Sequence, residues 1–164
     1  MDLYIVRHGI AEIRGEGPDE MRRLTSKGVR KTTEVAEGLA KLECKVDRIA
    51  SSPLPRADET ARIMREVLCP DAPCDICDFL APGATASELV LWLSKVEDKS
   101  VMIVGHNPDF EEIASSLLAG DQGMDIVLKK AAVCKIAFHG RAAKGKGQLH
   151  WLMQPGQLRL IGAS

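Results

Sequence analysis

Two histidines stand where they could carry out chemistry. His8 and His106 each follow a short apolar run, and each has a glycine beside it, Gly9 in the case of His8. Glycine carries no Cβ, so backbone and ligand can approach closely at such a position. His139 and His150 lack this setting, and we interpret them as structural. His8 and His106 are therefore the candidate catalytic histidines.

Two arginines accompany these histidines. Arg7 precedes His8, and Arg56 follows another apolar run. The planar guanidinium offers a fork of donors that matches phosphate oxygens. Asn107 is a preferred helix N-cap and Pro108 a preferred first residue, so we expect a helix to begin there and to point its backbone N–H groups at the same place. Two arginines, two histidines and a helix start predict a pocket for an anion.

The spacing of apolar residues predicts the elements that position this pocket. The chain alternates short apolar runs with stretches of helical periodicity, and residues 11–23 are polar and suit an exposed loop. Ser26 is the expected N-cap of the first helix, and Pro70 ends the second. Strands are predicted at 2–6, 46–50, 100–104, 132–138 and 148–153, with a weaker one at 75–80, and helices after Ser26, at 57–68, 87–96 and 107–120.

This alternation predicts an α/β fold of three layers, with a largely parallel central sheet and helices on both faces. The length of 164 residues fits a single domain spanning 1–164. In such sheets ligands bind beyond the carboxyl ends of the strands. Three segments are expected there: Arg7-His8-Gly9, Ser51 to Arg56, and Gly105-His106-Asn107.

Composition narrows the function classes. The formal net charge is −1, which gives no electrostatic reason to expect nucleic acid or a membrane as the partner. The start of the chain lacks the pattern of a secretory signal, and no apolar stretch is long enough to span a bilayer. We therefore expect a cytoplasmic protein, and a monomer.

The five cysteines are an odd number in a chain without an export signal, which predicts free thiols. Cys69, Cys74 and Cys77 have the C-x4-C-x2-C spacing that also occurs in iron–sulfur ligation. Their fourth ligand would have to be the distant Cys134. We interpret these cysteines as incidental and expect no metal site.

Several segments resemble a known family. Arg7-His8-Gly9 is similar to the R-H-G signature of the histidine phosphatase superfamily, which also contains the phosphoglycerate mutases. Residues 51–61 resemble its second signature, S-S-P-x-x-R-A-x-x-T-A, and residues 104–108 its third. Residues 22–28 and 151–158 look like segments of the small SixA-type phosphohistidine phosphatases, although Arg23 stands where proline is usual. The resemblance covers essentially the whole chain and implies no cap domain.

The resemblance implies a role for each residue. His8 would attack phosphorus as a neutral imidazole and become phosphohistidine, while its other ring nitrogen donates to a backbone carbonyl. Arg7, Arg56 and His106 would surround the phosphoryl oxygens, where transition-state charge accumulates. No metal or other cofactor is required, because these cations already neutralise the phosphoryl group. The substrate-binding positions would be Gly9, Arg22 at the rim, and Asn107.

The position of a general acid leaves the substrate open. Where relatives that act on phosphomonoesters carry a glutamate, the resemblance places Phe79, with Asp78 next to it and Glu88 further along on what we expect to be a solvated helix face. A missing acid favours phosphohistidine on a phosphotransfer or phosphorelay protein. A small phosphomonoester, with Asp78 or Glu88 as acid, stays an alternative. A non-catalytic module that recognises phosphate is a third interpretation.

Overall fold

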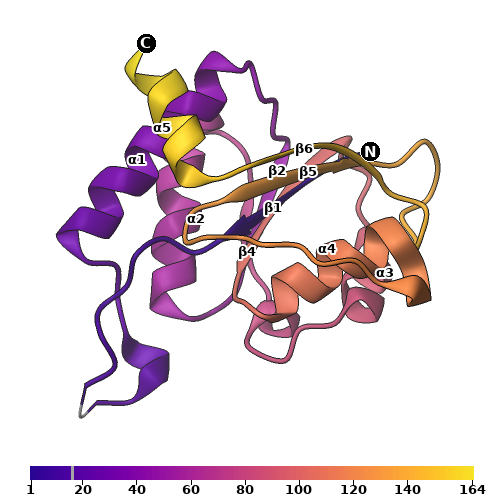
Figure 1. Ribbon diagram of the computed structural model, residues 1–164, viewed down its shortest axis with the longest axis horizontal. Coiled ribbons are helices and arrows are strands. Elements are labelled where there is room, and N and C mark those ends of the chain that lie inside the picture. The colour runs from indigo at the N-terminus through magenta and orange to yellow at the C-terminus, as the bar shows by residue number, and fades with distance from the viewer. Residues whose placement is uncertain (16) are drawn as a thin grey trace.

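A six-stranded sheet forms the centre of the computed structural model, which describes residues 1–15 and 17–164 (Figure 1). The strands lie in the order β3-β2-β4-β1-β5-β6; β3, β2, β4 and β1 pair in parallel, and β5 and β6 add an antiparallel edge. The largely parallel sheet predicted from the sequence is therefore confirmed. The strands are β1 (Asp2–Arg7), β2 (Arg48–Ser51), β3 (Cys74–Ile76), β4 (Ser100–Gly105), β5 (Val133–Ala137) and β6 (Gln148–Met153).

Helices cover both faces of this sheet. Tyr4 and Val6 of β1 pack into a core with one group of helices, and Leu3 and Ile5 pack into a second core on the opposite face. This alternation follows from the two-residue period of side chains along a strand. The first face carries α1 (Ser26–Lys41), α2 (Pro55–Leu68) and α5 (Pro155–Ala163), and the second carries α3 (Ala86–Leu93) and α4 (Asp109–Ala119).

Two predicted helix starts are wrong by one or two residues. The N-cap of α1 is Thr25 rather than Ser26, and the Thr25 hydroxyl accepts a hydrogen bond from the Gly28 N–H at 2.9 Å. Asn107 does not cap α4: the N-cap is Pro108, the Asn107 Nδ2 donates to the carbonyl of Leu128 at 3.0 Å, and the Asn107 Oδ1 is buried without a partner among the described residues. The helix starts only at Asp109, after Pro108.

Two other segments differ from expectation. The strand predicted over 75–80 is only the short β3, after which the chain forms the 3₁₀ turn η2 (Asp78–Leu80). Helix α5 has no counterpart among the predicted helices. It begins with Pro155, and the side chains of Gln154 and Gln157 form a capping box. Its close packing on α1 needs Gly38, where a Cβ would lie 2.1 Å from the Leu158 carbonyl oxygen.

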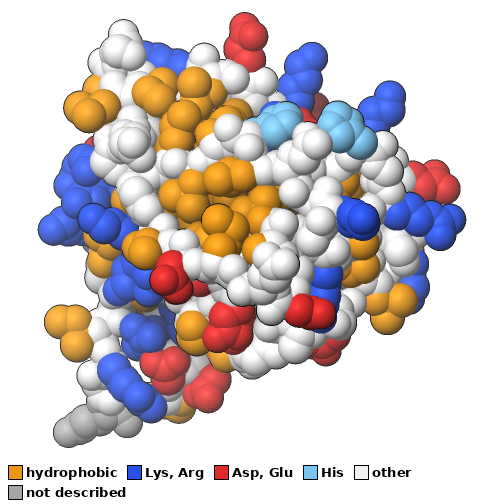
Figure 2. All heavy atoms as spheres, turned by 45° about the vertical axis from the view of Figure 1, so that its right-hand side comes forward, with side chains coloured by type: hydrophobic (Ala, Val, Ile, Leu, Met, Phe, Trp, Pro, Cys, Tyr) orange, Lys and Arg blue, Asp and Glu red, His pale blue; other side chains and the backbone are white. Residues whose placement is uncertain are grey.

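The polar segment 11–23 is a loop as expected wherever it can be described; residue 16 lies outside the described residues. It includes the 3₁₀ turn η1 (Asp19–Met21), and its ends are joined by a bridge between Ala11 and Leu24. Along the described chain, no helix has both the length and the apolar character to cross a membrane. Figure 2 shows that apolar side chains gather in the centre of one face of the molecule.

Candidate active site

The carboxyl ends of β1, β2 and β4 bring the predicted site residues together. Arg7 lies opposite Gly105, and Ser51 lies opposite Val104. Just beyond the sheet, the His8 N–H donates to the Gly105 carbonyl at 3.0 Å, as does the Ser52 N–H to the Val104 carbonyl at 3.0 Å. The three segments expected at one sheet edge are therefore neighbours in space.

The surroundings of His8 define its tautomer. Its Nδ1 lies 2.8 Å from the carbonyl oxygen of Gly9, and because a carbonyl can only accept, Nδ1 carries the hydrogen. The lone pair is therefore on Nε2. Only 6% of His8 is exposed, and this burial lowers its pKa to about 3; the positive charges of Arg56 and Arg7 act in the same direction. At neutral pH His8 is an uncharged imidazole, the form that can act as a nucleophile.

His106 lies beside His8, with 5.2 Å between the two ring centroids. Its Nε2 is 2.7 Å from the Ser52 hydroxyl, and Nδ1 is buried without a hydrogen-bond partner among the described residues. Burial lowers the pKa of His106 to about 4, and the charge of Arg56 contributes. Both histidines are therefore neutral at pH 7 in the absence of an anion.

Arg56 and Arg7 place two positive charges at this pocket. Arg56 is only 3% exposed and donates to the backbone carbonyl of Asp19 at 3.0 Å and to its carboxylate at 3.3 Å. Arg7 donates to the carbonyl of Leu128 at 2.8 Å. The Nε of each arginine is buried and has no partner among the described residues, so donors remain for an anion. Burial lowers the pKa of both guanidinium groups, which means that an arriving anion would be stabilising.

The rim of the site contains Arg22 and an acidic residue that the sequence did not reveal. Arg22 donates to the Asp19 carboxylate at 2.8 Å and to the carbonyl of Glu12 at 2.8 Å. The Asp19 carboxylate thus joins Arg22 to Arg56, and its pKa is lowered by its hydrogen bond to Arg22 and by both positive charges. The sequence pattern does not identify Asp19 as a site residue, because its contact with Arg56 depends on how loop 11–23 is folded.

Gly9 is required by the space around it. A Cβ at this position would lie 2.3 Å from the Thr32 hydroxyl oxygen, too close for any side chain. Its N–H donates to the Thr60 hydroxyl at 3.0 Å, which ties the loop after β1 to α2. Asn107 also lies at the site and shares the Leu128 carbonyl with Arg7. All seven residues singled out from the sequence are therefore at or beside one pocket edge, although Asn107 contributes no helix cap.

Comparison with known proteins identifies the family. Residues 3–80 match the model of the histidine phosphatase superfamily, branch 1. An uncharacterized protein of Picosynechococcus sp. (strain ATCC 27264 / PCC 7002 / PR-6) is 36% identical over 137 residues, which are 81% of this chain and 82% of that protein. The chain belongs to the histidine phosphatase superfamily.

Within this superfamily the similarity to SixA-type proteins extends over the full length. The phosphohistidine phosphatase SixA of Escherichia coli (strain K12) is 22% identical over 166 residues, covering 99% of both chains. A structure of the protein histidine phosphatase SixA complexed with tungstate superposes with a TM-score of 0.84, at 22% identity, over 96% of this chain and 99% of that one. At this identity the superposition establishes the fold.

Phe79, which stands at the expected acid position of this histidine phosphatase, and the two candidate acids have different surroundings. Phe79 is half-buried in η2, with its ring centroid 5.7 Å from that of Trp92. Asp78 is exposed. Glu88 is exposed in the first turn of α3, where its carboxylate accepts a hydrogen bond from the Thr85 hydroxyl at 2.7 Å. The Glu88 carboxylate therefore binds the N-cap residue of α3.

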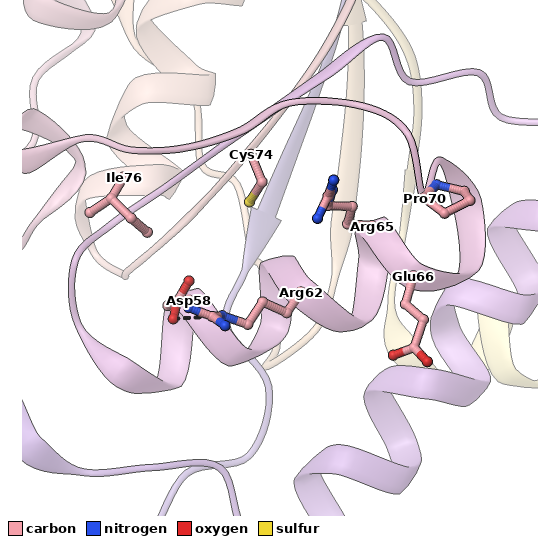
Figure 3. A pocket seen from close by; sticks show the side chains of 7 residues that line it. All are labelled: Asp58, Arg62, Arg65, Glu66, Pro70, Cys74 and Ile76. Carbon is pink, nitrogen blue, oxygen red and sulfur yellow. Dashed lines mark hydrogen bonds and ion pairs between the residues drawn. The ribbon is translucent and has the colours of Figure 1, made fainter.

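Another hollow of this phosphatase, about 480 Å³ in volume, lies between α2 and β3 (Figure 3). Three of its four charged lining residues are used internally: Arg62 donates to Asp58 at 2.9 Å, and Arg65 donates to the Ala72 carbonyl at 2.7 Å. Burial raises the pKa of the Cys74 thiol at its wall. All five cysteines are free, and the described residues contain no group of three His, Cys, Asp or Glu side chains placed to hold a metal ion. This hollow carries none of the expected chemistry.

Proposed function

We propose that this protein is a phosphohistidine phosphatase that removes phosphoryl groups from a phosphotransfer or phosphorelay protein, with His8 as the nucleophile. The observation that carries the proposal is the contact of His8 Nδ1 with the Gly9 carbonyl, 2.8 Å long, in a buried histidine that has the charges of Arg56 and Arg7 nearby. It leaves a neutral ring whose Nε2 lone pair is available to phosphorus. We further propose that the chain acts as a single cytoplasmic domain without a metal.

The reaction proceeds in two transfers. In the first, the Nε2 lone pair of His8 forms a bond to phosphorus as the bond from phosphorus to the substrate nitrogen breaks, and that electron pair stays on the leaving imidazole. In the second, the oxygen of water forms a bond to phosphorus as the bond from phosphorus to His8 Nε2 breaks; that electron pair returns to the imidazole, and the protons of the water leave with the inorganic phosphate. Arg7, Arg56 and His106 stabilise the charge on the phosphoryl oxygens in both steps.

The leaving group explains the choice of substrate. An alkoxide needs a proton from an acid as it departs, and such an acid typically accelerates the step by roughly 10²–10⁴-fold. Phe79 stands at the position where we expect that acid, and its ring packs towards Trp92. A substrate imidazole can instead be protonated on its second nitrogen before it leaves. The site is therefore better suited to phosphohistidine than to an alkyl phosphate.

The decisive experiment compares turnover of a phosphohistidine-bearing phosphotransfer protein with turnover of a panel of alkyl phosphates. We expect efficient hydrolysis of the first and poor hydrolysis of the second. Asp78→Asn and Glu88→Gln should each keep most of the phosphohistidine activity, since neither group is needed as an acid. If wild-type protein cleaved alkyl phosphates equally well and Asp78→Asn abolished only that reaction, Asp78 would be a general acid and the phosphomonoesterase alternative would replace ours.

The covalent intermediate provides an independent check. Brief mixing with labelled substrate should leave acid-labile, alkali-stable label on His8, and His8→Ala should lose both label and activity. Label trapped on His106, or full activity of His8→Ala, would contradict the assigned nucleophile. Binding of the phosphorylated protein without any release of phosphate would point to the non-catalytic interpretation.

A further inference from the structure

A second basic surface adjoins the phosphate pocket. A groove of about 500 Å³ lies between the start of α5, the middle of α1 and the segment before β5. In Figure 2 Lys and Arg side chains gather at the left of the molecule, the side on which α1 and α5 lie in Figure 1. We call this the basic groove; its charged lining residues are Arg7, Lys31, Lys129, Lys130 and Arg159.

The positive charge of the basic groove is largely uncompensated. Arg159 is bonded to the carboxylate of Glu34, but no carboxylate lines the groove among the described residues. The charge of Lys27 lowers the pKa of Lys31, and burial together with the charge of Arg7 lowers the pKa of Lys130. Like charges held this close repel one another, so an anion in the groove would relieve their repulsion.

The basic groove adjoins the backbone of the proposed nucleophile. Arg7 belongs to both sites, and the Ala131 N–H in the groove wall donates to the carbonyls of Arg7 and His8 at 3.0 and 3.1 Å. Thr32 lines the groove with a fully buried hydroxyl that has no hydrogen-bond partner among the described residues. Through Arg7 the groove therefore begins beside the residue that would receive the phosphoryl group.

We propose that the basic groove binds acidic side chains of the protein that carries the phosphohistidine, next to the phosphorylated residue. This inference rests on the proposed function and adds the feature by which the substrate protein is selected. The transferred phosphoryl group is matched by Arg7 and Arg56, so the lysines on α1 and on the segment before β5 remain for a second anion. Carboxylates on a protein surface fit a wide, open groove of this kind, because they can meet several separated cations at once.

The test reverses two charges of the groove, Lys31→Glu with Lys129→Glu. The matched control is Lys144→Glu with Lys146→Glu, which makes the same charge change in exposed lysines on the connection between β5 and β6, at the opposite edge of the sheet. For the phosphohistidine-bearing protein, kcat/KM should fall at least roughly tenfold in the groove variant, and its dependence on salt should weaken. The control should match wild type, and hydrolysis of free phosphohistidine should change less than about threefold in both.

Two results would overturn this inference: an undiminished rate on the protein substrate in the groove variant, or an equal loss on free phosphohistidine. A second measurement separates it from the proposed function. A fluorescent peptide rich in Asp and Glu should bind wild type and control by anisotropy, and not the groove variant. If the phosphohistidine protein were never hydrolysed but this peptide still bound selectively, the proposed function would fail and the groove would stand. Absence of selective peptide binding would count against the groove itself.

Discussion

The two buried histidines should make the stability of the fold depend on pH. In the unfolded chain each has a pKa of about 6.5. In the folded protein burial lowers the pKa of His8 to about 3 and that of His106 to about 4. The folded state therefore binds fewer protons than the unfolded state between these values, and stability falls as the pH decreases through about 6.5.

The size of this effect follows from the two pKa differences. Between pH 7 and pH 5 each unfolded histidine takes up most of one proton, while the folded histidines take up almost none. Each then removes about 2 kcal/mol from the free energy of unfolding, and the pair about 4 kcal/mol. Since domains of this size are stable by about 5–15 kcal/mol, the loss should be easy to measure.

The assay is urea unfolding at pH 7, 6 and 5, followed by circular dichroism. The matched variant carries His8→Asn, whose amide can still donate to the Gly9 carbonyl, and His106→Gln, whose amide can still reach the Ser52 hydroxyl. It should lose about 4 kcal/mol less than wild type between pH 7 and pH 5. Equal pH slopes for the two proteins would refute the reasoning, since they would mean that the histidines are hydrated in the folded state and titrate normally.

Three further predictions concern the pocket. Arg56→Lys should keep the fold but lower the rate of phosphoryl transfer by roughly 10²-fold or more, because the planar fork of donors is lost; a rate near wild type, measured with a folded variant, would contradict its role. Gly9→Ala should lower the free energy of unfolding by about 1–3 kcal/mol, and Gly9→Ala with Thr32→Ala should recover part of that loss, because the hydroxyl only 2.3 Å from the new methyl is then gone. Chelators such as EDTA should leave the rate unchanged; strong inhibition that an added metal reverses would overturn the metal-free mechanism.

The pocket could be predicted from sequence because it depends on strand ends. His8, after Arg7, and His106, after Gly105, each stand at the end of an apolar run, and neighbouring parallel strands present their carboxyl ends at one edge. The register of β1 on β4 then places the two histidines together without further information. Local composition was sufficient for this part of the site.

Features that depend on side-chain partners could not be predicted in the same way. Asp19 reaches Arg22 within one turn, but it reaches Arg56 only through the way in which loop 11–23 is folded. Asn107 has the residue type of a helix cap, but its Nδ2 donates to the distant Leu128 carbonyl and its Oδ1 caps no helix N–H. Helix α5 is short, and its place is set by the close approach of Leu158 to Gly38 on α1. Each of these depends on contacts between segments far apart in the chain.

The charges of the site have opposite effects before and after an anion arrives. Burial lowers the pKa of His8, and the charges of Arg56 and Arg7 lower it further, so that in the proposed mechanism its lone pair is free for attack. The Nε donor of each guanidinium group is buried without a partner among the described residues, and in the proposed mechanism a phosphoryl group would supply one. A phosphoryl dianion offsets their field and raises the affinity of the neighbouring His106 for a proton. In the proposed mechanism both imidazoles are thus neutral before an anion binds, and a bound phosphoryl group would favour a charged His106 beside its oxygens, where positive charge would stabilise the transition state.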